Sequence, residues 1–232
     1  MVLRGLISSL TIAFSIVFIC SAPAVQIGQL DNFQDSTVQN WTNGGAPGVP
    51  PVLNLAGGPL GASDRYMQIS ATGGSGIGGR LTVFNRAQWL GDYISQGITA
   101  IEVDLNNFSN LTLSIRVAFK QEIGPLGPGY LSQPFVLAPN SGWQHAVFTL
   151  TPGTLTAIND PFAFNQFFSG NFEEFRFINS FTGSDLNGDP VAAVLGIDNI
   201  HAVPEPGPLA LTAIALLTLG LLRHRKCRAI WR

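Results

Sequence analysis

The aromatic side chains are the first candidates for chemistry in this chain, because exposed rings present a flat apolar surface on which sugars stack. Tyr130 ends a loop rich in glycine and proline that starts at Gly124, so we expect its ring to be exposed. Trp89 and Tyr93 are four residues apart and would share one face of a short helix. The sequence therefore predicts Tyr130, Trp89 and Tyr93 as candidate ligand-binding residues.

Residues suited to catalysis are sparse. Both cysteines, Cys20 and Cys227, lie near the chain ends, and no serine sits in a Gly-x-Ser-x-Gly nucleophile elbow. Glu173 and Glu174 are adjacent, so on a strand they would point to opposite faces. A glycoside hydrolase needs two carboxyl groups that face each other. We therefore expect no enzymatic activity, and a polysaccharide hydrolase is the less favoured alternative.

Short apolar and β-branched runs separated by glycine, proline and asparagine dominate the middle of the chain. In Leu111 to Val117 the odd positions are apolar and the even positions polar, as in a strand with one buried face. Only Arg86 to Gln96 has helical spacing. The pattern predicts an all-β domain over residues 25–202, an antiparallel jelly-roll-like β-sandwich. The expected strands are Gln26 to Phe33, Tyr66 to Ala71, Arg80 to Phe84, Ala100 to Leu105, Thr112 to Phe119, Gln133 to Leu137, Gln144 to Leu150, Glu174 to Ile178 and Val194 to Ala202.

Residues 1–24 have the features of a secretory signal peptide. Arg4 precedes an apolar segment that ends at Ala22-Pro23-Ala24, a small-x-small pattern that signal peptidase accepts. The apolar run is shorter than the roughly 20 residues that span a bilayer, so an uncleaved membrane helix is the less favoured alternative. We expect export from the cytoplasm and cleavage after Ala24.

The C-terminal end carries three unlike elements in a fixed order. Val203-Pro204-Glu205-Pro206-Gly207 should interrupt any strand or helix, because proline lacks a donor and restricts the residue before it. Pro208 to Leu222 has no charge and would form a helix about 22 Å long. A basic cluster from Arg223 to Arg228 then marks the cytoplasmic side of a membrane anchor. A buried core helix is the alternative, but it leaves the basic cluster unexplained.

This order, over Val203 to Arg228, resembles the PEP-CTERM sorting domain. In that family an exosortase of Gram-negative bacteria that make exopolysaccharide recognises the tail and cuts it near Pro-Glu-Pro. The resemblance implies a precursor anchored in the inner membrane by a transmembrane helix, and a mature protein at the cell surface or in the extracellular matrix. The partners that it implies are an exosortase-type enzyme, the membrane and exopolysaccharide.

Between its two ends the chain is acidic. Residues 25–202 hold six Lys and Arg residues against thirteen Asp and Glu residues, although the whole chain has a formal charge of only −2. An acidic surface repels phosphate backbones, so we expect no nucleic-acid partner. The first hypothesis is therefore a non-enzymatic surface or matrix protein.

Several short motifs of the domain resemble the galactose-binding-like β-sandwiches of carbohydrate-binding modules. They are Leu30-Asp31-Asn32-Phe33-Gln34-Asp35 with Trp41, Asp64 to Ile69, Gly142-Trp143-Gln144, and Gly196 to Ile200. The resemblance implies core positions for Trp41 and Trp143, and a carbohydrate-binding module with a specific glycan ligand as the alternative function.

In such sandwiches a structural calcium ion often joins the first strand to the last, which implies a calcium site at Asp31, Asp64 and Asp198. The alternative is that these aspartates cap turns or accept hydrogen bonds from backbone amides. No other cofactor is predicted.

Overall fold

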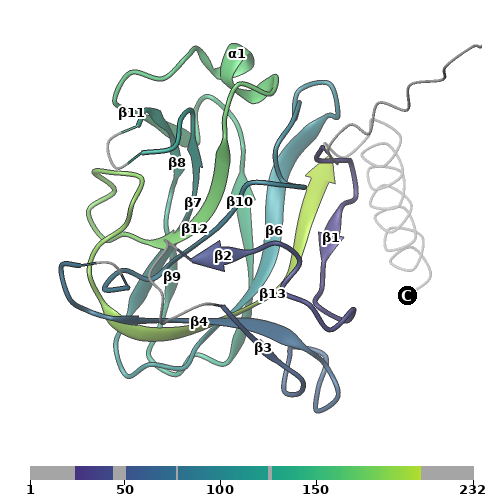
Figure 1. Ribbon diagram of the computed structural model, residues 1–232, viewed down its shortest axis with the longest axis vertical. Coiled ribbons are helices and arrows are strands. Elements are labelled where there is room, and N and C mark those ends of the chain that lie inside the picture. The colour runs from purple at the N-terminus through teal and green to yellow at the C-terminus, as the bar shows by residue number, and fades with distance from the viewer. Residues whose placement is uncertain (1–23, 44–50, 77, 125–126, 205–232) are drawn as a thin grey trace, which may run out of the picture.

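The computed structural model describes residues 24–43, 51–76, 78–124 and 127–204. These residues form two antiparallel sheets with a single short helix, so the predicted all-β sandwich is confirmed (Figure 1). Residues 1–23 of the expected signal peptide (1–24) and residues 205–228 of the expected sorting segment (203–228) lie outside the described residues. Within the described ranges, no helix is both long and apolar enough to cross a membrane.

The six-stranded sheet consists of β1 (Leu30–Asp31), β3 (Val52–Asn54), β4 (Tyr66–Thr72), β6 (Ile98–Asn107), β10 (Trp143–Thr149) and β13 (Ala192–Pro204). Its order is β10-β6-β13-β4-β3, and β1 pairs with β13. Strand β13 pairs with β4 up to Ile197 and with β1 at Ile200 and His201. The pairing of β13 with β6 shifts register between Asp198 and His201, which is also where β13 passes from β4 to β1. One long strand therefore pairs with β4 and β1 along one edge and with β6 along the other.

The seven-stranded sheet consists of β2 (Thr42–Asn43), β5 (Thr82–Asn85), β7 (Leu113–Lys120), β8 (Gly129–Ser132), β9 (Phe135–Leu137), β11 (Leu155–Ile158) and β12 (Glu174–Asn179). Its order is β11-β8-β7-β12-β5-β2, and β9 pairs with the first half of β7. The helix α1 (Phe164–Phe168) lies at one end of the sandwich and buries Phe167 and Phe168 (Figure 1).

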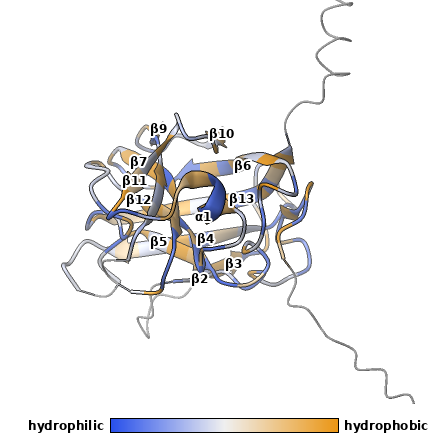
Figure 2. Ribbon diagram, turned by 90° about the horizontal axis from the view of Figure 1, so that it is seen from above, coloured by the Kyte–Doolittle hydropathy of each residue, from blue (hydrophilic) through white to orange (hydrophobic). Residues whose placement is uncertain are grey.

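The core between the sheets is rich in aromatic rings. Alternate residues of β7, including Val117 and Phe119, point into it, as the alternation in sequence predicts. The ring of Phe119 stacks on that of Phe175 with 4.9 Å between their centroids, and Trp41 meets Phe175 edge-on at 5.5 Å. Hydrophobic residues therefore recur along the strands of both sheets (Figure 2).

The helix expected over Arg86 to Gln96 does not form, and this segment is a series of turns. Its backbone finds partners elsewhere: Leu90 O accepts from Val25 N at 2.7 Å, and Tyr93 N donates to Phe168 O at 2.9 Å. Tertiary hydrogen bonds thus override the local helical spacing. The sequence prediction also missed β2, β3, β8 and β11, each of two to four residues, because they are too short to show a period.

The last strand continues further than the proline motif predicts. Val203 pairs with Ala100, and after a register shift Pro204 pairs with Ile98. Proline can occupy this place because its φ suits an extended backbone and a strand end loses little from the missing donor. The expected break at Val203 is therefore wrong by two residues, whereas Glu205, Pro206 and Gly207 lie outside the described residues.

Candidate functional site

The six-stranded sheet has one face toward the core and one face turned outward. Leu105, Ile197 and Met67 are neighbours across three strands and belong to the core. Successive strand residues point to opposite sides, so the residues that alternate with these three face outward. We call this set the outer face; its strand residues are Leu30, Val52, Asn54, Tyr66, Gln68, Ser70, Thr72, Ala100, Glu102, Asp104, Asn106, Trp143, His145, Val147, Thr149, Ala192, Val194, Gly196, Asp198, His201 and Val203.

Three aromatic rings gather on the outer face. Tyr66 lies 5.2 Å from Trp143 and 5.9 Å from Phe108, the residue that follows β6, measured between ring centroids. Phe108 and Trp143 meet edge-on at 6.5 Å. Phe108 is 41% exposed, Trp143 is half-buried and Tyr66 is buried beneath them. We call these residues the outer ring cluster, and its exposed member is Phe108.

A glycine sets how closely these rings approach the sheet. A Cβ atom at Gly196 would lie 2.9 Å from Phe108 Cε2 and 2.9 Å from Trp143 Cη2, closer than real Cβ contacts. The indole Nε1 of Trp143 donates to Gly57 O at 2.9 Å, which fixes the ring against the β3–β4 loop. The backbone and one hydrogen bond therefore preorganise the cluster.

Polar side chains lie beside the outer ring cluster. His145 is two residues from Trp143 on the same face of β10, and its Nδ1 lies 2.9 Å from Asp104 Oδ1. The second oxygen of Asp104 accepts from Asn199 Nδ2 at 2.8 Å. Glu102 lies between two imidazoles, with its Oε2 at 3.9 Å from His145 Nε2 and 3.6 Å from His201 Nδ1. The outer face thus offers rings and charged hydrogen-bonding groups side by side.

The three rings predicted to bind ligand lie inside the protein instead. Trp89 is 0%, Tyr93 is 1% and Tyr130 is 7% exposed. Tyr130 lies on β8 and not in a loop, where its ring meets Phe167 at 4.9 Å. Its hydroxyl donates to Phe162 O at 3.0 Å. The exposure predicted for Tyr130 is therefore wrong, and all three rings pack in the core, where they offer no surface on which a sugar could stack.

The resemblance to carbohydrate-binding β-sandwiches implied core positions for Trp41 and Trp143. This expectation is right for Trp41 and wrong for Trp143. Trp41 is buried between the sheets, whereas Trp143 lies on the outer face. The alternation along β10 is the signal that could have placed it, because Ala146 and Phe148 point inward and Trp143 shares the parity of His145.

Asp31 is a buried acceptor for the two core indoles. Its Oδ2 accepts from Trp41 Nε1 and from Trp89 Nε1, both at 2.7 Å, and from Gln88 Nε2 at 3.0 Å. Burial raises the pKa of this carboxyl, and the hydrogen bonds from Trp89, Trp41 and Gln88 oppose that rise. The alternative that this aspartate accepts hydrogen bonds therefore describes it, although the donors are side chains and not backbone amides.

Asp198 lies close to Asp64, the second of the three aspartates predicted to bind calcium. Asp198 is fully buried, and its Oδ2 has no hydrogen-bond partner among the described residues. Burial first, and then the nearby carboxylates of Asp64 and Asp104, raise the pKa of Asp198 to about 8. In the described ranges, no three His, Cys, Asp or Glu side chains are arranged to hold a metal ion. Calcium at Asp31, Asp64 and Asp198 stays a prediction of the sequence.

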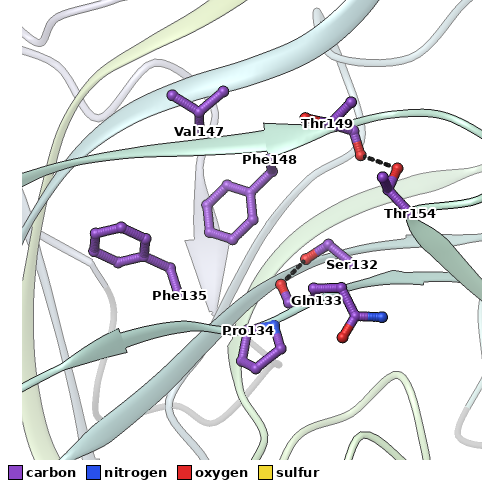
Figure 3. A pocket seen from close by; sticks show the side chains of 8 residues that line it. All are labelled: Ser132, Gln133, Pro134, Phe135, Val147, Phe148, Thr149 and Thr154. Atoms are coloured by element: carbon purple, nitrogen blue, oxygen red, sulfur yellow. Dashed lines mark hydrogen bonds between the residues drawn. The ribbon is translucent and has the colours of Figure 1, made fainter.

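A cavity of about 150 Å³ opens where β10 of one sheet approaches β9 of the other. The side chains of Phe135 and Phe148 line one part of it, and at another Thr154 Oγ1 donates to Thr149 O at 2.7 Å (Figure 3). Gln133 adds an amide to this lining. This pocket is mostly apolar and is a second place where a small ligand could lie.

No protein-family model and no curated protein matches this chain. Its structure is similar to solved structures. A family 11 carbohydrate-binding module from Clostridium thermocellum, in complex with a β-1,3-1,4-mixed-linked tetrasaccharide, is 14% identical with a TM-score of 0.50, and the match covers 77% of this chain and 96% of that one. An exo-β-agarase is 9% identical with a TM-score of 0.52, over 77% of this chain and only 25% of the agarase.

At such low identity these likenesses establish the fold alone. The chain is a β-sandwich whose fold is similar to that of a carbohydrate-binding module and to one quarter of a larger agarase chain.

Proposed function

We propose that this sandwich is a non-catalytic carbohydrate-binding domain, and that it binds polysaccharide on the outer face of its six-stranded sheet. The observation that carries the proposal is the outer ring cluster beside Asp104 and His145. Rings contact the apolar face of a pyranose, while adjacent carboxylate and imidazole groups accept and donate hydrogen bonds to its hydroxyls. The likeness to a module solved with a bound tetrasaccharide supports this use of the fold.

The arrangement of the glutamates supports binding without hydrolysis. Glu174 is fully buried, with Arg86 Nη2 at 2.6 Å from its Oε2 and Arg176 Nε bonded to its Oε1. A carboxylate that is fully buried and bonded to two guanidinium groups is out of reach of a glycosidic oxygen. Its neighbour Glu173 is exposed, and its Oε2 accepts a hydrogen bond from Ile123 N at 3.3 Å.

Two variants test which place binds sugar. Phe108→Ala removes the exposed ring of the outer ring cluster, and Phe135→Ala removes a ring from the pocket between β9 and β10. After a glycan array has identified a bound oligosaccharide, we expect Phe108→Ala to weaken its binding about tenfold or more, since a hot-spot ring contributes over about 1.4 kcal/mol. Phe135→Ala should leave the affinity unchanged.

If only Phe135→Ala lowers the affinity for the oligosaccharide, the sugar binds in the pocket between β9 and β10 and not on the outer face. Failure of the wild-type protein to bind any glycan would refute the proposed function. Thermal melting of both variants controls for misfolding.

We propose in addition that the chain is exported, sorted through its C-terminal tail, and delivered to the cell surface or matrix of a Gram-negative bacterium that makes exopolysaccharide. The order of Pro-Glu-Pro, apolar segment and basic cluster supports this proposal. Mass spectrometry of the mature protein from a host with an exosortase should find a C-terminus near Pro204 to Pro206. A mature protein that retains the residues up to Arg232 would contradict it.

A further inference from the structure

The charge on the outer face is one-sided. Its strand residues include the acidic side chains of Glu102, Asp104 and Asp198, and none of them is lysine or arginine. Arg65 precedes β4 in the chain, and its Nη1 donates to Gln34 O. Asp64 adds another carboxylate close to Asp198. A ligand on this face therefore meets a negative surface.

A ligand can reach two of these carboxylates. The side chain of Glu102 is 32% exposed and that of Asp104 is 19% exposed. In the described part of the chain, the side chain of Glu102 has no hydrogen bond, and its Oε2 lies 3.6 Å from His201 Nδ1 and 3.9 Å from His145 Nε2. Asp104 is held in place by Asn199 and His145. Glu102 thus has unused acceptor capacity next to an oriented carboxylate.

The buried member of the group adds a second observation. Asp198 lies directly across from Asp104 on the outer face and is fully buried, and its Oδ2 lacks a hydrogen-bond partner among the described residues. Its pKa of about 8 means that it carries a proton at neutral pH, and positive charge brought near it would stabilise its ionised form. Asp198 therefore adds no positive charge that would oppose a cation near Glu102 and Asp104.

These carboxylates lie within reach of a sugar on the outer ring cluster. Asp104 is the cross-strand partner of His145, and His145 is two residues from Trp143, about 7 Å along the strand. A sugar unit stacked on Phe108 and Trp143 would place the next units of a polymer near Asp104 and Glu102. The rings and the carboxylates therefore form one continuous surface.

From this surface we infer that the glycan is one with free amino groups, a polysaccharide of deacetylated hexosamine units whose ammonium groups pair with Glu102 and Asp104. This inference rests on the proposed carbohydrate-binding function and names its substrate class. An ammonium group forms charge-assisted hydrogen bonds to carboxylates, whereas uronate or sulfate groups would be repelled. A neutral glycan would use the rings and donate hydroxyl hydrogen bonds to these carboxylates, without the gain from pairing opposite charges.

The test measures binding of the full chain by calorimetry, with a chelator present so that divalent cations do not occupy the carboxylates. The probes are a glucosamine oligosaccharide, its fully N-acetylated counterpart and a neutral glucose oligosaccharide of equal length and linkage. We expect the glucosamine oligosaccharide to bind about tenfold tighter than the other two at low salt, with the advantage shrinking as salt rises.

Charge-neutral variants locate the effect. Glu102→Gln and Asp104→Asn should lower the affinity for the glucosamine oligosaccharide toward that for its N-acetylated counterpart. Glu173→Gln removes an exposed carboxylate of the other sheet and should change nothing. Equal affinity for the amino and neutral probes, or an effect of Glu173→Gln as large as that of Glu102→Gln, would overturn the inference.

The proposed function fails separately from this inference. If the neutral probe binds as tightly as the amino probe and Phe108→Ala abolishes both, the outer face binds glycans but does not select ammonium groups. If no probe binds, both the proposed function and the inference are refuted.

Discussion

Replacing Asp31 by alanine should remove a large part of the folding stability of this protein. Asp31 Oδ2 is the acceptor for the indole N–H groups of Trp41 and Trp89, and these rings are 2% and 0% exposed. Gln88 also loses a bond, but its Nε2 keeps Gln39 O as an acceptor at 2.5 Å. The change therefore leaves two buried donors without a partner.

The expected size follows from these two donors. An unsatisfied buried donor costs about 1–3 kcal/mol, so the pair costs about 2–6 kcal/mol. Part of this is offset, because the variant no longer buries a carboxylate whose pKa burial has raised. We expect Asp31→Ala to lower the free energy of unfolding by about 2–4 kcal/mol, and Asp31→Asn by about 1 kcal/mol, since an amide oxygen still accepts but carries no charge.

Urea unfolding followed by tryptophan fluorescence measures both variants, with an unchanged m-value as evidence that the unfolded state is the same. Asp35→Ala is the matched control: its carboxylate accepts from Thr37 N at 2.9 Å in an exposed turn, and its loss should move the midpoint far less. If the free energy of unfolding of Asp31→Ala lies within about 0.5 kcal/mol of the wild-type value, the two indoles do not depend on this carboxylate, and the reasoning is refuted.

Three further predictions concern the outer face and the predicted calcium site. Gly196→Ala should weaken glycan binding in the array assay by pushing apart the rings of Phe108 and Trp143, and unchanged binding would show that their approach to the sheet is unimportant. Asp198 has a pKa of about 8 in the folded protein, against an ordinary value of 3.8. Between these pH values the folded state keeps a proton that the unfolded state has released. The free energy of unfolding therefore falls as pH rises from about 4 to 8. Asp198→Asn should lose less stability over this range in urea unfolding at pH 5 and pH 8, and a parallel loss in both proteins would contradict the assignment. The calcium predicted at Asp31, Asp64 and Asp198 is tested by the melting temperature with and without a chelator: a bound ion predicts a drop on chelation, and an unchanged value would count against the site.

The sequence by itself determined the class of the fold. The alternation of Leu113, Ile115 and Val117 with polar neighbours requires a strand with one buried face, and repeated glycine and proline separate such strands into a sandwich. It also pointed to Asp31, Asp64 and Asp198 through a resemblance; the structure buries all three, and calcium there stays a prediction. The order of unlike elements at the C-terminus is likewise a property of sequence alone.

Only the tertiary structure decided which side chains meet. Trp89 and Tyr93 have helical spacing, but hydrogen bonds to Val25 and Phe168 hold their segment in turns and bury both rings. The outer ring cluster joins residues from β4, from the end of β6 and from β10, which are far apart in the chain. Strand pairing and register determine such a surface, and these depend on the balance of contacts across the whole sheet, which local patterns do not contain.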